Sequence, residues 1–151
     1  DQLMYTGADL LVKTVEAMAA GDYPLQDQVG LLAGREPKHA PKIFKEDMKV
    51  DWTLGVDAIF NHIRGLSPFP TAWTEFRNKK NGEVVSLKIF ETERIVKDHG
   101  KDVGLSTDNK TYLDVLVEGG VIRIKELQLS GKKRMKTEEF LRGFHIEDYS
   151  L

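Results

Sequence analysis

Basic side chains gather in one short segment of this chain, where they could bind the phosphates of a nucleic acid. Lys132, Lys133, Arg134 and Lys136 follow directly after an apolar run that ends at Leu129. Each lysine or arginine that contacts a phosphate backbone releases condensed counterions, and this release drives nucleic-acid binding. The alternative interpretation of such a run is a solvated surface turn.

The patterns of other common chemistries are missing from the sequence. Without cysteine, the chain has no disulfide, thiolate zinc site, iron–sulfur cluster or cysteine nucleophile. The four histidines are isolated and lack the spacing of metal ligands. Gly131–Lys133 lacks the remaining residues of a phosphate-binding P-loop, and no serine lies in a G-x-S-x-G motif. Glu91 and Glu93 are typical of a solvated strand face. From these residues alone, the chain is not expected to be a complete enzyme.

Length and composition indicate one ordinary globular domain with room for an appendage. The 151 residues include 22 Lys+Arg and 24 Asp+Glu, a balance that excludes a globally basic nucleic-acid binder but not a local basic patch. The longest apolar runs are far short of the ~20 residues of a membrane span, and the N-terminal residues are acidic where a signal peptide is basic. We therefore expect a cytoplasmic protein with no membrane partner. The start at Asp1, running straight into a helical pattern, suggests a piece of a longer protein.

The first part of the chain predicts two helices separated by a linker. An apolar stripe behind a Thr6–Asp9 capping pattern predicts a helix over 6–20. Periodicity then disappears, while prolines and glycines accumulate as in a linker. A second apolar stripe predicts a helix that is capped by Thr53 and ends at Gly65.

After residue 70 the apolar residues alternate, which predicts antiparallel strands. The alternating runs are Ala72–Phe76, Val84–Glu91, Leu113–Val117 and Val121–Leu129. In the last run the inward parity switches near Lys125 and Glu126, which predicts a β-bulge that bends the strand. A short helix capped by Thr137 and ended by Gly143 follows. The expected fold class is mainly β with helices (α+β): a short helix followed by an antiparallel barrel or a strongly curled sheet.

Five aromatic residues could either stack on nucleobases or fill the core. They are Trp52, Phe69, Trp73, Phe76 and Phe90. Each lies where the predicted elements need a core, so we expect all of them to be core residues.

Several strings of residues occur in an order that is itself informative. They are Ala40–Ile43, Lys45–Asp47, Asp51–Thr53, Ile63–Gly65, Ser67–Trp73, Glu126–Gln128 and Gly131–Met135. Over about 40–143 this order resembles the methionyl-tRNA formyltransferase family, and Thr6–Leu11 resembles the last helix of that family's catalytic domain. The resemblance implies that residues 1–21 are the tail of a Rossmann-like formyltransferase domain, that 22–42 are a linker, and that 43–151 form an OB-like C-terminal barrel.

In that family the whole enzyme transfers a formyl group from 10-formyltetrahydrofolate to the amino group of methionine on initiator tRNA, and the barrel helps to hold the tRNA. The resemblance implies two partners, initiator methionyl-tRNA and the N-terminal formyltransferase domain of the same protein, and a monomeric state. The family's catalytic Asn, His and Asp and its folate-site segment lie in the N-terminal domain, and no position of this chain matches them. No catalytic, cofactor-binding or metal-binding residue is therefore assigned, and the chain by itself is expected to be inactive.

The residues and the resemblance together predict RNA-phosphate contacts. The candidates are Lys132, Lys133, Arg134 and Lys136, with Lys42, Arg64, Lys79 and Lys80 as weaker ones. Phosphate contacts orient a substrate and carry little sequence information, so the barrel is expected to supply affinity and positioning without discrimination. Two alternatives stay open: a related formyltransferase that acts on another amine, such as a nucleotide sugar, and a barrel that only packs on the catalytic domain and binds no RNA.

Overall fold

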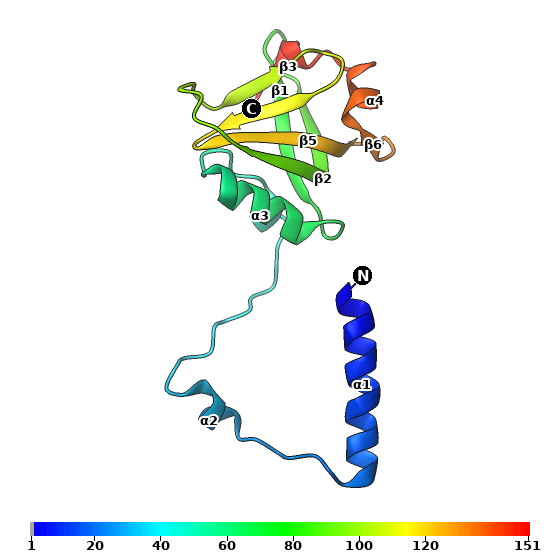
Figure 1. The fold of residues 1–151 in the computed structure, drawn as a ribbon. Coiled ribbons are helices and arrows are strands. Elements are labelled where there is room, and N and C mark those ends of the chain that lie inside the picture. The colour runs from blue at the N-terminus through cyan, green and yellow to red at the C-terminus, as the bar shows by residue number, and fades with distance from the viewer. Residues whose placement is uncertain (1) are drawn as a thin grey trace. The chain divides into compact units, whose positions relative to one another are not determined.

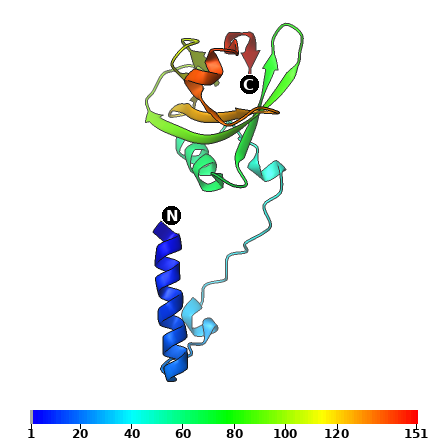
Figure 2. The ribbon, with the colours of Figure 1, turned by 90° about the vertical axis from the view of Figure 1, so that its right-hand side faces the viewer.

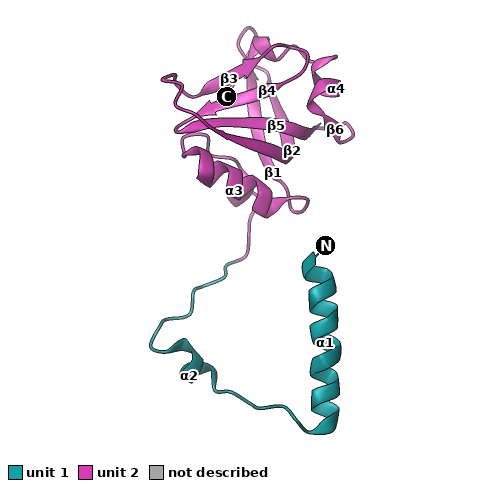
Figure 3. Cartoon of the chain, in the orientation of Figure 1, with its two compact units in different colours: residues 1–41 teal, residues 42–151 magenta. Residues whose placement is uncertain are grey.

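The computed structural model describes residues 2–151, and the chain divides into two compact units, residues 1–41 and 42–151 (Figure 3). Within the described residues, no helix combines the length and the apolar character that a membrane crossing requires.

The first unit consists of two helices and extended chain. Helix α1 spans Gln2–Ala20 and ends where Gly21 adopts a φ of 74°. The predicted start at Thr6 is wrong, because the preceding residues contain no glycine or proline and simply extend the helix. The short helix α2, Gln28–Leu32, was not predicted; the Asp27 side chain caps it by accepting a hydrogen bond from the Gly30 N–H at 3.2 Å.

The second unit is built on one antiparallel sheet that curls into a nearly closed barrel (Figures 1 and 2). Its strands are β1 (Ala72–Asn78), β2 (Val84–Val96), β3 (Gly104–Thr107), β4 (Leu113–Val117), β5 (Gly120–Leu129), β6 (Met135–Lys136) and β7 (Tyr149–Ser150). They pair in the order β3-β4-β5-β2-β1-β7, and β6 pairs with β5. This arrangement confirms the expected α+β class with an OB-like antiparallel barrel.

The long strands β2 and β5 bend where their pairing is interrupted. Ile89 pairs with Leu127 and Thr92 pairs with Ile124, and the only pair between them joins Glu91 and Glu126. Lys125 on β5 and Phe90 on β2 consequently have no partner in this ladder. The predicted bulge near Lys125 is confirmed, and the irregularity at Phe90 accompanies it on the neighbouring strand.

Helix α3, Val56–Leu66, lies below the barrel in the view of Figure 1 and buries Ile59 and Ile63 against it. The predicted cap at Thr53 is wrong, because Gly55 occupies the N-cap position. The Thr53 hydroxyl instead donates to the Asp51 carboxylate at 2.7 Å. The Val56 N–H donates to the Glu118 carbonyl at 2.9 Å, so the turn between β4 and β5 holds the start of the helix.

The remaining helices are short. They are α4 (Thr137–Leu141) and the 3-10 turns η1 (Glu46–Met48) and η2 (Ile146–Asp148). Lys136, not Thr137, is the N-cap residue of α4, so the predicted cap is wrong here too. The Thr137 hydroxyl instead donates a hydrogen bond to the Ile124 carbonyl at 2.5 Å. This bond attaches α4 to the bulged part of β5.

The core lies inside the barrel and between the barrel and α3, and only two of the five aromatic residues expected there are buried. Trp52 and Phe76 are buried, as expected. The expectation is wrong for the other three: Phe69 is 86% exposed, and Trp73 and Phe90 are only partly buried. Trp73 lies on β1 between the buried neighbours Ala72 and Thr74, so strand alternation turns its side chain away from the core.

Candidate nucleic-acid interface

The turn after β5 presents the predicted lysines to solvent. Gly131 adopts a φ of 74°, and the Lys132 N–H donates to the Leu129 carbonyl at 3.0 Å. The Gln128 side-chain amide donates to the Lys132 carbonyl at 2.7 Å. These bonds fix the backbone of the turn, while the side chains of Lys132 and Lys133 stay exposed. The turn thus holds two cations outward on a defined backbone.

Ion pairs partly neutralise this segment. Lys133 lies 3.0 Å from a carboxylate oxygen of Glu139, and Arg134 pairs with Glu126. The hydrogen bond from Arg134 lowers the pKa of Glu126 and raises that of Arg134. Lys132 forms no salt bridge within residues 2–151. The Lys133–Glu139 pair is exposed, and such pairs contribute at most about 1 kcal/mol, so a phosphate can replace Glu139 as the partner of Lys133 at little cost.

Phe90 lies next to both arginines of the predicted set. The Arg134 guanidinium lies 4.2 Å from the centroid of the Phe90 ring. Arg64, in the last turn of α3, lines a surface recess of about 210 Å³ together with Ser67 and Phe90. The structure therefore places Arg64 and Arg134 each beside Phe90, a residue for which the sequence predicted only a core position.

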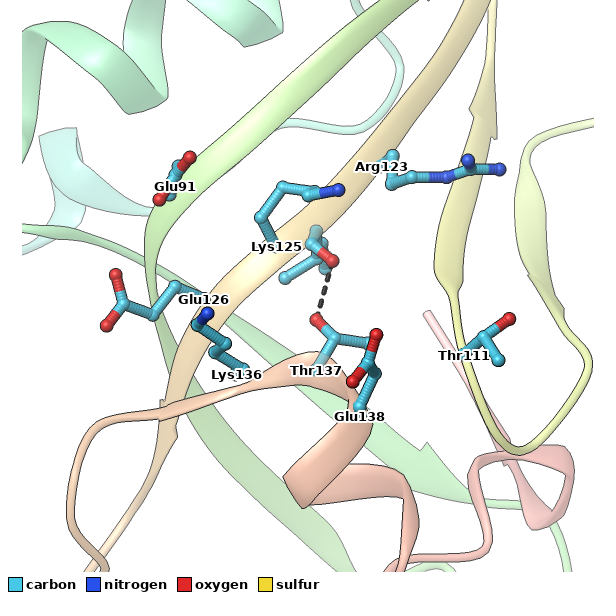
Figure 4. Close-up of a pocket in the computed structure, with 9 residues that line it drawn as sticks. Glu91, Thr111, Arg123, Lys125, Glu126, Lys136, Thr137 and Glu138 are labelled. Carbon is cyan, nitrogen blue, oxygen red and sulfur yellow. Dashed lines mark hydrogen bonds between the residues drawn. The ribbon is translucent and has the colours of Figure 1, made fainter.

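Lys136 lies in a different setting, a pocket of about 270 Å³ between β5, β6 and the start of α4 (Figure 4). It pairs with Glu126 across the β5–β6 ladder, and the two side chains lie next to one another in Figure 4. The lining carries three basic and three acidic side chains: Arg123, Lys125, Lys136, Glu91, Glu126 and Glu138. This balance gives the pocket no net attraction for a phosphate.

Lys79 and Lys80 are engaged at the turn between β1 and β2. The Lys79 ammonium donates to the Glu147 carbonyl at 2.9 Å, and Lys80 lies 2.6 Å from a carboxylate oxygen of Asp148. Its hydrogen bond with Asp148 raises the pKa of Lys80 and lowers that of Asp148. Within residues 2–151, no hydrogen bond or ion pair joins these lysines to the turn after β5. Their observed contacts hold η2 against the sheet.

Lys42, the remaining candidate, is the first residue of the second unit, and its ammonium lies 5.4 Å from the centroid of the Phe44 ring. No group of three His, Asp or Glu side chains in the described chain is placed to hold a metal ion.

A second group of cations, around Trp73, lies outside the predicted set of RNA contacts. The ammonium groups of Lys45 and Lys49 lie 5.4 Å and 5.1 Å from the Trp73 ring, and Lys88 pairs with Trp73 across the β1–β2 ladder. Gln128 pairs with Lys88 on the other side, which connects this group to the turn after β5. The alternation of β1 and β2 was a usable signal, but only the strand register shows that these positions are neighbours.

Comparison with known proteins gives this surface its context. Residues 42–145 match the family model for the formyl transferase C-terminal domain. A methionyl-tRNA formyltransferase of Phocaeicola vulgatus is 45% identical over 150 residues, covering 98% of this chain and 46% of the relative. The methionyl-tRNA formyltransferase of Bacteroides fragilis strain YCH46 is 44% identical over 149 residues, covering 98% of this chain and 46% of the relative. That of Parabacteroides distasonis is 40% identical over 154 residues, covering 100% of this chain and 47% of the relative.

The chain thus spans about half the length of these curated relatives, and the family model covers most of its second unit. By the family model, which covers most of the chain, this chain belongs to the formyl transferase C-terminal domain family over residues 42–145, and the relatives that it resembles are named methionyl-tRNA formyltransferases.

Proposed function

We propose that this chain is the C-terminal, tRNA-binding portion of a methionyl-tRNA formyltransferase. The parent enzyme would transfer a formyl group from 10-formyltetrahydrofolate to the amino group of methionyl initiator tRNA in the cytoplasm. Helix α1 and residues up to 21 would be the tail of its catalytic domain, residues 22–42 a linker, and residues 43–151 the barrel that holds the tRNA. The catalytic and folate-binding groups would lie in the other half of a monomeric protein.

The observation that carries RNA binding is the exposed turn after β5. Lys132 and Lys133 project from a hydrogen-bonded backbone, and Arg134 adjoins them beside Phe90. A rigid scaffold that presents several cations can contact successive phosphates without ordering a loop on binding. Arg64 lines a recess with Phe90 and Glu91 of β2, and the Trp73 group, in which Lys49 also pairs with Glu75, adjoins β2 at Lys88.

The test is binding of the 151-residue chain to initiator tRNA and to an elongator tRNA across a salt series. We expect weak binding to both RNAs that falls steeply with salt. Lys132→Glu/Lys133→Glu should weaken binding to both by tenfold or more and reduce the salt slope by about 2, roughly 1 for each lost phosphate contact.

A matched control reverses two other exposed lysines, Lys101→Glu/Lys110→Glu, which carry the same change in net charge. We expect this variant to bind within about twofold of the wild type. Absence of binding at low salt, or equal losses in both double variants, would contradict the proposed tRNA contact and favour a barrel that only packs on the catalytic domain.

A further inference from the structure

Phe69 is exposed to an unusual degree for a phenylalanine. It lies in the connection between α3 and β1, and 86% of its surface is accessible. Full burial of such a side chain would contribute about 2 kcal/mol or more to stability, which this position leaves unused. The ring is therefore available to an external partner.

The backbone on both sides of Phe69 is held in place. The Ser67 hydroxyl donates to the Phe90 carbonyl at 2.7 Å, and the Thr71 hydroxyl donates to the Pro68 carbonyl at 2.5 Å. The Thr71 N–H donates to the Leu66 carbonyl at 2.8 Å. Proline on either side of Phe69 also fixes φ at those positions. The exposed ring thus stands on a fixed support, and binding to it requires little further ordering of the chain.

Two arginines lie near this support. Ser67 lines the same recess as Arg64, Phe90 and Glu91, and Arg134 lies over the Phe90 ring. Arg64 donates a hydrogen bond to the Asn61 side-chain oxygen at 2.8 Å but forms no salt bridge within residues 2–151. An exposed aromatic ring on a segment that adjoins arginines matches a ligand that combines flat bases with a negatively charged backbone.

We propose that Phe69 stacks on an unpaired nucleobase of the bound RNA, while Arg64 and Arg134 contact the phosphates that flank this base. The inference rests on the proposed function and deepens it, because it adds a contact that does not depend on charge. Stacking accepts any base, so this contact would add affinity and fix the position of the RNA without reading its sequence.

The experiment compares the full chain with Phe69→Ala, Phe69→Leu and Phe69→Trp in binding to initiator tRNA over a salt series. We expect Phe69→Ala to weaken binding roughly 5- to 100-fold by the same factor at every salt concentration, leaving the slope unchanged. Phe69→Leu, which is apolar but cannot stack, should lose nearly as much as Phe69→Ala. Phe69→Trp should bind at least as tightly as the wild type.

Val96→Ala is the matched control, since Val96 is also an exposed apolar residue and lies at the far end of β2. It should bind like the wild type, and thermal unfolding should show that all variants are folded. A fully base-paired RNA duplex supplies the second control, because the effect of Phe69→Ala should disappear on it.

The outcomes separate the two proposals. If the wild type binds tRNA and Phe69→Ala binds equally well, the stacking contact is wrong while the electrostatic function stands. If Phe69→Leu binds tRNA as tightly as the wild type, stacking is likewise wrong and a simple apolar contact is favoured. If the wild type binds no RNA, both proposals fail.

Discussion

The two tryptophans carry out different roles because their side chains lie in different surroundings. The Trp52 indole N–H donates to the Thr74 hydroxyl at 2.8 Å, and both residues are buried. The Trp73 indole N–H donates to the Lys45 carbonyl at 2.9 Å in an exposed setting. We expect Trp52→Phe to lower the free energy of unfolding by about 2 kcal/mol, since it removes buried volume and leaves the Thr74 hydroxyl without its partner.

Trp73→Phe is the matched variant and should cost well under about 1 kcal/mol, because water can replace the lost partner. Urea unfolding followed by circular dichroism measures both values. Equal losses of unfolding free energy in the two variants would contradict the role of burial around Trp52.

Asp108 organises the turn between β3 and β4 as a charged acceptor. Its carboxylate accepts hydrogen bonds from the Thr111 hydroxyl at 2.5 Å and from the N–H groups of Lys110, Thr111 and Tyr112. The Thr111 hydroxyl is the main cause that holds the pKa of Asp108 well below its ordinary value. Because the pKa of Asp108 is depressed in the folded protein, its ionised carboxylate stabilises the folded turn fully above the ordinary aspartate range. This stabilisation is lost as pH falls through the folded pKa.

We therefore expect the amides of residues 110–112 to stay protected from exchange at about pH 4, where an ordinary aspartate is half protonated. In Asp108→Asn the protection should be weaker and should not vary over this acidic range. NMR titration of these amides provides the measurement, and a midpoint near pH 4 in the wild type would contradict the prediction.

At the residue scale, the sequence identified the exposed cations but not the exposed aromatics. Lys132 and Lys133 could be predicted because a turn signal and their charge agree. Phe69 and Phe90 could not, since their residue type does not distinguish a core position from a surface position, whereas for Trp73 the alternation of β1 was a usable signal. Phe90 in particular lies at an interruption of the β2–β5 ladder that only the pairing of two distant strands reveals.

Among the elements, the close approach of β2 and β5 depends on one glycine. A Cβ on Gly120 would overlap the carbonyl oxygen of Ile95 and lie 3.1 Å from Cγ2 of Val56. The overlapped atom belongs to the backbone, so β2 and β5 must move apart to relieve this steric clash. We expect Gly120→Ala to lower the free energy of unfolding by about 3 kcal/mol.

Gly65→Ala is the control, since Gly65 is exposed in α3 and nothing lies near its Cβ position. This substitution should raise stability by up to about 1 kcal/mol through helix propensity. Chemical denaturation of the two variants tests the pair, and a Gly120→Ala variant as stable as the wild type would contradict the close packing.

The sequence predicted the central elements well and their ends poorly. Apolar alternation located β1, β2, β4 and β5, and the parity switch located the bulge, because these features are written in consecutive residues. The starts of α3 and α4 depend on distant partners, the Glu118 and Ile124 carbonyls, and so left no local signal. Strands β3, β6 and β7 have at most four residues, which is too few to establish a period.

For the whole molecule, the barrel core is contained in the second unit. Its buried cluster runs from Val50 to Ile146, all within residues 42–151. Helix α1 has no buried residue, and its apolar side chains, such as Leu3 and Leu11, are exposed. The curl of the sheet depends on the paired irregularities of β2 and β5.

The closure of the barrel also bears on self-association of the protein. The sheet ends at β3 on one side and at β7 on the other, and both strands are very short. The Asn109 amide donates to the Glu147 carboxylate at 2.6 Å, which ties the β3–β4 turn to η2. Unpaired strand edges are templates for pairing with other chains. We therefore expect residues 146–150 to reduce edge-to-edge aggregation by covering the edges of the sheet, in addition to contributing Ile146 to the core.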